Sequence, residues 1–531
     1  MKSCSKCTTV YSDNELNFCL EDGSPLSHPI NVDLDLPTKR FVLVQDPIAP
    51  KTLIMNPMGS SAGETKRRVA RLKAIDSIAV LPFANVSVDP AKEYIVDGIT
   101  ESIINELSQL GRLRVVARNT AFRYKGLGVD LRVLSQRLNV RVFLTGRVRE
   151  LGNRLIVGTE LVDGTSGFQL WGQHFEFKLA DIFDVQHTIA KEISEKLSLK
   201  FSVNYTRRSN KRTAVSTEAF ELYLKGRFHW NTLTEEGFFR SVEFFEASCE
   251  KEPTFALAHA GVADAYGALA YFNYVSPREA FPLSGKSAAR ALELDDTLAE
   301  AHLSLASFRF FFECDWQLAE FGFKRAIDLR PSCASAHHIY GHCLASLGRF
   351  DEAIAEMERA HKFDPLSVII GCSLGFTFYR SRNYDEAIRH FQNVLDLIPT
   401  LPLAHEGLGA VYLETGADDE AVAEYLNAMS HWPRSDKTIP ALRQAFNEAG
   451  ITGFWRKWLE HCGEDLKPDL ITPYHVAGAY ARIGEKELAF KWLEKAFEER
   501  IGFIIYLKVE PMFDNLRTDP RFGNLLRRVG L

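Results

Sequence analysis

Long apolar runs are missing from this sequence of 531 residues. No stretch approaches the roughly 20 consecutive apolar residues that a membrane-spanning helix needs, so we expect no membrane span. Met1–Leu20 has no apolar centre between a basic start and a small-residue cleavage site, so we expect no secretory signal. Both absences favour a cytoplasmic protein.

The short motifs that mark most catalytic folds are also missing. The sequence has no Gly-x-x-x-x-Gly-Lys-Ser/Thr loop and no His-Glu-x-x-His, kinase or nucleophile-elbow pattern. Gly126–Gly128 lacks the third glycine of a dinucleotide-binding turn. Asp97, Glu101 and Asp163 suit capping and turn roles better than paired acid catalysis. We therefore expect a protein that is not an enzyme.

An excess of basic residues is missing as well, because the formal net charge is −6. A general nucleic-acid coat would be basic, so nucleic acid is not expected as the main partner. A hydrophobic content of 46% and a charged content of 25% describe an ordinary globular protein. The length exceeds what one hydrophobic core supports, so roughly two to four domains are expected.

What the sequence does contain is a series of prolines at a fixed interval. Pro331, Pro365, Pro399 and Pro433 follow one another at 34 residues. Small residues recur with them, at Gly341, Gly375 and Gly409 and again at Ala353, Ala387 and Ala421. This period predicts tandem helix pairs, in which the small residues let the two helices approach closely and the proline ends the second helix.

The pattern resembles the tetratricopeptide repeat. The large packing positions of that family are filled in successive units by Tyr340, Leu344, Phe350 and Met357, by Leu374, Phe378, Tyr384 and Phe391, and by Leu408, Tyr412 and Tyr425. More divergent units precede and follow these three, between about residues 217 and 510. The resemblance implies a helical superhelix whose groove binds another protein or peptide.

In that family the first helix of each pair lines the groove. Carried over to this sequence, the resemblance implies that partner contacts come from Phe310, His338, His342, Phe376, Tyr379, Arg380, Glu406 and Glu414. For each of them, an ordinary solvated surface position is the alternative. His338 and His342 have the spacing of a metal-binding pair on a helix, but the sequence shows no third ligand for them.

Three cysteines, Cys4, Cys7 and Cys19, lie close together near residue 1. A Cys-x-x-Cys turn presents two thiolates, and a second such turn completes a tetrahedral zinc site. Asp22 stands where the fourth cysteine would be, in a segment that resembles the short zinc ribbons at the head of many bacterial proteins. The resemblance implies Zn²⁺ bound by Cys4, Cys7, Cys19 and Asp22. An unmetallated remnant and a redox role are the alternatives.

Between these regions, the sequence predicts an α/β domain with one sheet. A strand at 77–81, a helix from Asp97, a strand at 113–117 and a helix around 131–138 come first. Alternating strands at 140–148, 155–161 and 168–177 then form a meander, followed by a helix at 181–197. The phrases Ile78–Phe83, Asp97–Glu101, Tyr124–Gly126 and Leu170–Trp171 resemble the TolB-like amino-terminal (FlgO-like) domain. That domain often precedes tetratricopeptide repeats in bacterial adenylate cyclase-type and CadC-type regulators.

The predicted fold is therefore multidomain: a zinc-ribbon-like segment, an α/β domain and an all-α superhelix. The expected parts are 1–26 (zinc ribbon), 27–74 (flexible linker), 75–202 (TolB-like), 203–216 (linker), 217–510 (repeats) and 511–531 (cap). The leading hypothesis is a non-enzymatic scaffold or regulatory protein that binds a partner polypeptide. The alternatives are a nucleic-acid-linked regulator that uses residues 1–74, and a nucleotide-cyclase-associated protein.

Overall fold

The computed structural model describes residues 75–87, 89, 92–178, 182–197, 215–430, 435–464 and 471–531, and the backbone of three short strands, β1 (Lys2–Cys4), β2 (Val10–Tyr11) and β3 (Leu26–Ser27). The chain divides into two units, 1–59 and 60–531, and each is described by itself. In the first unit, β1 pairs antiparallel with both β2 and β3. Of the predicted zinc ligands, Cys7, Cys19 and Asp22 lie outside the described residues, and only the backbone of Cys4 is described.

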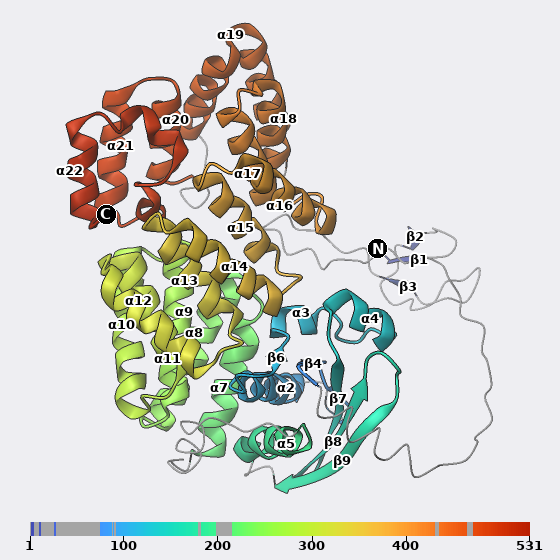
Figure 1. Cartoon of the computed structure of the whole chain (residues 1–531). Coiled ribbons are helices and arrows are strands. Elements are labelled where there is room, and N and C mark those ends of the chain that lie inside the picture. Colours follow the sequence, from blue (N-terminus) through green and yellow to red (C-terminus); the bar gives the residue numbers. More distant parts are fainter. Residues whose placement is uncertain are drawn as a thin grey trace. The chain divides into compact units, whose positions relative to one another are not determined.

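A mixed six-stranded sheet forms the centre of the α/β domain (Figure 1). Its strands are β4 (Ser77–Val80), β5 (Ala84–Asn85), β6 (Arg114–Val115), β7 (Val142–Leu151), β8 (Arg154–Asp163) and β9 (Gln169–Lys178). They lie in the order β6–β4–β7–β8–β9, and β5 also pairs with β7. The first strands are parallel, whereas β7, β8 and β9 form an antiparallel meander. The predicted single-sheet α/β domain is confirmed.

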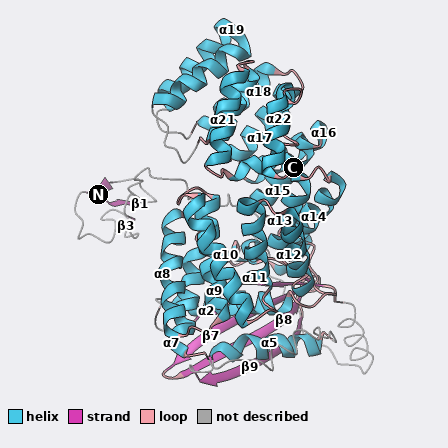
Figure 2. Cartoon of the chain, turned by 90° about the vertical axis from the view of Figure 1, so that its left-hand side faces the viewer, coloured by secondary structure: helices cyan, strands magenta, loops and turns pink. Residues whose placement is uncertain are grey.

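Helices cover both faces of this sheet, because successive side chains on a strand point to opposite sides. The helices are α2 (Glu93–Leu107), α3 (Arg118–Phe122), α4 (Leu131–Leu138) and α5 (Ile182–Lys196). Ile78 and Val80 of β4 belong to the core that α2 and α5 share. Ala79, between them in sequence, belongs to a second core with Leu134 and Leu138 of α4. Figure 2 shows α5 lying along the meander.

From residue 217 onward the described chain is helical. The helices are α7 (Thr217–Trp230), α8 (Glu235–Lys251), α9 (Ala256–Tyr271), α10 (Pro277–Leu294), α11 (Ala299–Phe308), the π-helical turn η3 (Arg309–Glu313), α12 (Trp316–Leu329), α13 (Ala334–Ser346), α14 (Phe350–Phe363), α15 (Val368–Arg380), α16 (Tyr384–Leu397), α17 (Pro402–Glu414), α18 (Asp418–Met429), α19 (Ser435–Glu464), α20 (Pro473–Arg482), α21 (Lys486–Glu498), the 3₁₀ turns η4 (Gly502–Tyr506) and η5 (Pro511–Leu516), and α22 (Pro520–Val529). Consecutive helices pack as pairs, and each pair packs on the next (Figure 1). The predicted repeat superhelix is confirmed.

A buried ion-pair network centred on Glu101 of α2 joins the α/β domain to the repeats. Arg227 of α7 donates to Glu101 Oε1 from Nη2 (2.6 Å) and Nε (3.0 Å), and Asn231 donates to Oε2 (2.7 Å). Nε of Arg118 lies 3.0 Å from the same Oε2. Burial alone would raise the pKa of this carboxyl, but Arg227 and Arg118 hold the pKa below its ordinary value. Glu101 is therefore ionised and fully paired.

The network continues into the repeats. Nη1 of Arg227 lies 3.3 Å from Oδ2 of Asp264 on α9, and Oδ1 of Asp264 accepts from the Ser304 hydroxyl on α11 at 2.5 Å. Helix α2 also approaches α7 closely, because a Cβ at Gly98 would lie 2.6 Å from Leu224 Cδ2. The domain thus bonds directly to the first repeat through Arg227 and Asn231, and Arg227 carries the network on into the next two repeats.

A second set of contacts joins the domain to the loop between α14 and α15. The Thr120 hydroxyl donates to Asp364 Oδ1 at 2.6 Å and accepts from the amide of Leu366 at 3.1 Å. The amide of Ala117 donates to the carbonyl of Phe363 at 2.8 Å. A third contact lies between these two in sequence, where the Ser332 hydroxyl donates to the carbonyl of Leu113 at 3.1 Å.

We predict that Glu101→Ala lowers the free energy of unfolding by about 3–5 kcal/mol, because Arg227 and Arg118 stay buried without their counter-charge. The matched control is Glu218→Ala, which removes an exposed ion pair with Lys251 and should cost less than about 1 kcal/mol. Urea unfolding of the whole chain, followed by tryptophan fluorescence, measures both. Equal losses in the two variants would contradict the role of Glu101.

Candidate protein-binding face

The three regular repeats place side chains at equivalent positions on α13, α15 and α17. Because residues three, four and seven apart share one side of a helix, we call the side that carries the following residues the inner face. It consists of His338 and His342 on α13, Ile369, Cys372, Phe376 and Arg380 on α15, and Leu403, Glu406, Ala410 and Glu414 on α17. A hydrogen bond of 2.8 Å between His338 Nε2 and the Ser373 hydroxyl links α13 to α15 at this side.

The chain's own C-terminal segment, residues 501–516, covers the α13 end of the inner face. Glu510 accepts from Nε of Arg380 at 2.8 Å, and these two side chains are only 7% and 8% exposed. The guanidinium of Arg380 also lies 3.7 Å from the centre of the Tyr506 ring. The Tyr506 hydroxyl lies 2.5 Å from Nδ1 of His342. Aromatic, acidic and hydroxyl groups of this segment thus occupy positions where a partner was expected.

The burial of its apolar side chains shows how firmly the C-terminal segment is held in the fold. Ile505, Leu507, Phe513 and Leu516 are all 0% exposed. Each fully buried side chain of this size contributes about 1.5–3 kcal/mol, so the four together contribute about 6–12 kcal/mol as an upper bound. A partner would have to replace all of this burial to displace the segment. We conclude that the C-terminal segment is structural.

Two histidines form a hydrogen-bonded chain under this segment. Nε2 of His342 lies 3.0 Å from Nε2 of His338. A neutral imidazole has one donor and one acceptor nitrogen, so His342 donates from one ring nitrogen and accepts at the other, between the Tyr506 hydroxyl and His338. Burial lowers the pKa of His338 to about 4. Burial, with His338 and Arg380, holds the pKa of His342 well below its ordinary value.

The predicted partner contact at Phe310 needs correction. Phe310 is 0% exposed, and its ring packs against those of Phe311, Trp316 and Phe323. It lies in the π-helical turn η3. Phe310 stands 34 residues before Leu344 and 68 before Phe378, which are large packing positions of the repeats. The period therefore assigns Phe310 to the core between helices and not to the groove.

Four other predicted contacts lie on or beside the inner face but bond within the chain. His342 bonds to Tyr506 and Arg380 to Glu510. Tyr379 is 1% exposed and hydrogen-bonds to Arg482, and Glu414 pairs with Arg482 at 3.4 Å. In this structure these residues stabilise the fold.

Phe376 and Glu406 remain half-buried on the inner face. With Ile369, Leu403 and Ala410 they form what we call the open inner face. Ile369 is 50% exposed. Among the described residues, no hydrogen bond or ion pair joins the C-terminal segment to α17. This part of the inner face is therefore not held to the C-terminal segment by polar bonds.

Sequence reasoning missed Tyr506, Glu510 and Arg482. The available signal was the apolar run Ile501–Val509, which follows the last repeat and has no helical pattern of its own. An apolar run of this kind is expected to pack against another part of the protein. The neighbouring sequence does not indicate that this part is formed by α13 and α15.

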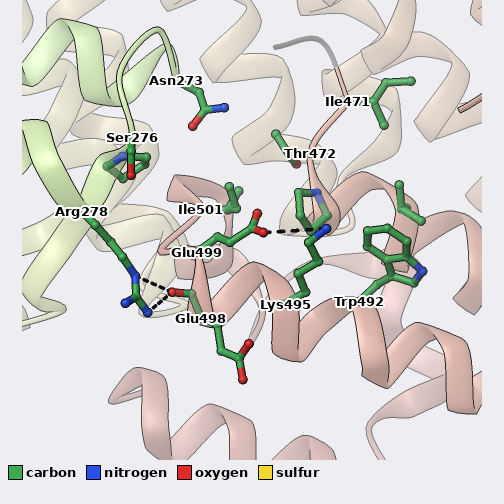
Figure 3. A pocket seen from close by; sticks show the side chains of 13 residues that line it. Asn273, Ser276, Arg278, Ile471, Thr472, Trp492, Lys495, Glu498, Glu499 and Ile501 are labelled. Carbon is green, nitrogen blue, oxygen red and sulfur yellow. Dashed lines mark hydrogen bonds and ion pairs between the residues drawn. The ribbon is translucent and has the colours of Figure 1, made fainter. Parts of the chain in front are cut away.

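A pocket of about 720 Å³ lies between the α9–α10 loop and helices α20 and α21 (Figure 3). Nε of Arg278 donates to the carbonyl of Glu498 at 2.8 Å, which ties the second repeat to the end of α21. The other cation, Lys495, lies 3.8 Å from Glu499. Both cations of the wall are thus engaged by groups of the chain, as Figure 3 shows.

Within the described parts of the chain, no group of three or more His, Cys, Asp or Glu side chains could hold a metal ion. Over the same residues, we find no helix that is both long and apolar enough for a bilayer.

Two family models match parts of this chain. The tetratricopeptide repeat model matches residues 315–367 and 373–433. The helical array contains tetratricopeptide repeats. Residues 73–192 match the model for the second domain of HilA/YgeH-like transcriptional regulators. The predicted TolB-like kinship of this domain stays a prediction.

Curated relatives share parts of the chain. "Putative adenylate cyclase 3" of Rhizobium meliloti (strain 1021) is 38% identical over 196 residues, which cover 36% of this chain and 33% of that protein. "Transcriptional regulator HilA" of Salmonella typhimurium (strain LT2) is 23% identical over 264 residues, which cover 49% of this chain and 46% of that protein. The chain thus spans less than half the length of either relative.

Solved structures with repeats also match. TTC0263, a thermophilic TPR protein of Thermus thermophilus, is 15% identical, and the match covers 37% of this chain and 99% of that one with a TM-score of 0.31. YrrB, described as a TPR protein with an unusual peptide-binding site, is 19% identical, with 36% and 93% covered and a TM-score of 0.27.

We predict that Arg380→Ala lowers the free energy of unfolding by about 3–5 kcal/mol, because Glu510 stays buried without a cation. Arg290→Ala is the control, since its ion pair with Glu293 is exposed and is worth less than about 1 kcal/mol. The Arg380→Met, Glu510→Leu double variant should be more stable than Arg380→Ala, because an apolar pair leaves no unpaired charge. Chemical unfolding of each variant tests this, and a double variant as unstable as Arg380→Ala would refute it.

We predict that the stability of the chain falls as the pH drops from about 6.5 toward 4. The pKa values of His338 and His342 lie below the ordinary value near 6.5, so in this window the unfolded chain binds more protons and unfolding is favoured. Unfolding curves of wild type and the His338→Gln, His342→Gln variant at several pH values isolate the effect. His390 and His475, whose pKa values burial also lowers to about 4, are present in both proteins. Parallel curves would contradict the prediction.

Proposed function

We propose that this chain is a non-enzymatic regulatory protein of the cytoplasm that binds a partner polypeptide on the open inner face of α15 and α17. The observation that carries the proposal is the apolar strip at Ile369, Phe376 and Leu403, in which Ile369 is 50% exposed and the other two side chains are half-buried. Tetratricopeptide arrays are extended surfaces suited to holding a peptide. Their presence here supports an interaction role.

The α/β domain acts in this proposal as a docking or sensing unit fixed to the repeats. The Glu101 network supports this, because Arg227 bonds both to Glu101 of the domain and to Asp264 of the second repeat, which in turn bonds to Ser304 of the third. A partner bound to α15 and α17 would thus be held at a set position relative to the sheet. The Zn²⁺ site at Cys4, Cys7, Cys19 and Asp22 remains part of the proposal and rests on sequence alone.

A second candidate is a nucleic-acid-linked transcriptional regulator. The match of residues 73–192 to a domain of transcriptional regulators favours it, as does the 264-residue similarity to one such protein. In this case residues 1–74 would make the contact, and binding would weaken with salt and disappear without that segment. The relative named as an adenylate cyclase shares only 33% of its length, and we propose no cyclase activity for this chain.

We predict that Ile369→Glu abolishes capture of the partner, because a charge on the open inner face opposes burial of apolar surface. The matched control is Phe321→Glu on α12, which places the same charge at a side chain that is 67% exposed on the second helix of a pair. Affinity capture from the native cytoplasm with the whole chain compares the two variants with wild type. A protein retained by wild type and Phe321→Glu, but not by Ile369→Glu, supports the proposal; one retained equally by all three refutes it.

A further inference from the structure

Glu406 is the acidic side chain at the middle of the open inner face. It lies on α17 at the position that His338 occupies on α13 and Cys372 on α15, 34 residues apart in each case. Its side chain is half-buried, with Leu403 and Ala410 on the same side of the helix. The carboxyl thus stands among apolar neighbours on a surface that still reaches solvent.

Within the described parts of the chain, no hydrogen bond or ion pair reaches the Glu406 carboxyl. The other acidic groups at this face are each matched by an arginine, Glu510 by Arg380 and Glu414 by Arg482. The titratable groups that sense Glu406 are neutral ones, the Cys372 thiol of α15 and the Tyr425 hydroxyl of α18. Burial raises the pKa of Glu406 to about 7, as expected for a carboxyl that lacks a cation.

We infer that Glu406 binds a lysine or arginine side chain of the partner polypeptide while apolar residues of the same peptide cover Ile369, Phe376 and Leu403. The inference rests on the proposed function. A cation is the fitting group, because a half-buried carboxylate is stabilised when an opposite charge replaces the water it loses. A neutral donor would leave the negative charge uncompensated. The chain matches its own buried acids, Glu510 and Glu414, in the same way.

Proton release follows from this arrangement. Near neutral pH a fraction of the free protein carries a proton on Glu406, because its pKa is about 7. A bound cation lowers that pKa, so complex formation expels the proton to solvent. Binding should therefore strengthen as the pH rises from 6 to 8, as long as the peptide's cation stays charged.

The probe is a phage-displayed library of random short peptides, selected on the whole chain. Three proteins are compared: wild type, Glu406→Gln and the control Glu420→Gln, which alters an exposed acid at the start of α18. Glu406→Gln keeps the shape of the side chain, and thermal melting checks that all three are folded. We expect wild type and Glu420→Gln to enrich peptides with Lys or Arg beside apolar residues, and Glu406→Gln to lose the basic preference.

Affinity and proton release are then measured for one selected basic peptide. Glu406→Gln should bind it about tenfold or more weakly, and calorimetry in two buffers of different ionisation enthalpy should show proton release with wild type only. Selection of the same peptides by wild type and Glu406→Gln would overturn the inference and leave the proposed function standing. Selection of no peptide above the bead background by wild type would overturn both.

Discussion

The Glu101 carboxylate is the point at which the α/β domain and the repeat array become one body. A buried charge is tolerated only when its hydrogen-bonding capacity is met, and here Arg227, Asn231 and Arg118 meet it from α7, the residue after it and α3. Because the bonds are directional and continue through Asp264 to Ser304, they determine the orientation of the sheet on the first repeats. Apolar contact alone would leave that orientation less defined.

The same requirement for paired buried charge decides which part of the inner face is available. Arg380 pairs with Glu510, and Arg482 pairs with Glu414. Each ion pair joins the inner face to a residue near the C-terminal end of the chain. The C-terminal segment is held there by the salt bridge and by the burial of Ile505, Leu507, Phe513 and Leu516. The surface left uncovered is the part near Glu406, where no arginine of the described chain reaches.

Patterns that repeat along the sequence predicted the structure well. The 34-residue period indicated α13 to α18 because each small residue faces a large one at a constant distance along the chain. Alternation of apolar and polar residues indicated the meander, in which β7 and β8 pair antiparallel. These features depend on contacts within one repeat or one hairpin. Contacts of this kind produce a periodic pattern in the sequence.

The predicted partner residues failed where the deciding contact is distant. The period places Arg380 on the inner side of α15, but Glu510 lies 130 residues further along the chain, and no local pattern reports it. At Phe310 the period itself indicates a packing position, because Leu344 and Phe378 follow it at 34-residue intervals. The sequence thus indicates which side of a helix a residue occupies, whereas the structure is needed to show what lies against it.

The spacing of α15 and α17 on the open inner face depends on buried packing beneath that face. Phe391 of α16 is 0% exposed and lies between α15 and α17. A Cβ at Gly375 would lie 2.6 Å from the Phe391 ring, and one at Gly407 would clash with the same ring. Phe376 meets that ring edge-on at 5.0 Å. The spacing of the two helices, and so the distance from Ile369 and Phe376 to Glu406, depends on the glycines at 375 and 407.

In a close-packed interior an added methyl group cannot be absorbed locally. A substitution at Gly407 would therefore change the spacing of α15 and α17 next to Glu406, and so the proposed recognition there, without altering the Glu406 side chain itself.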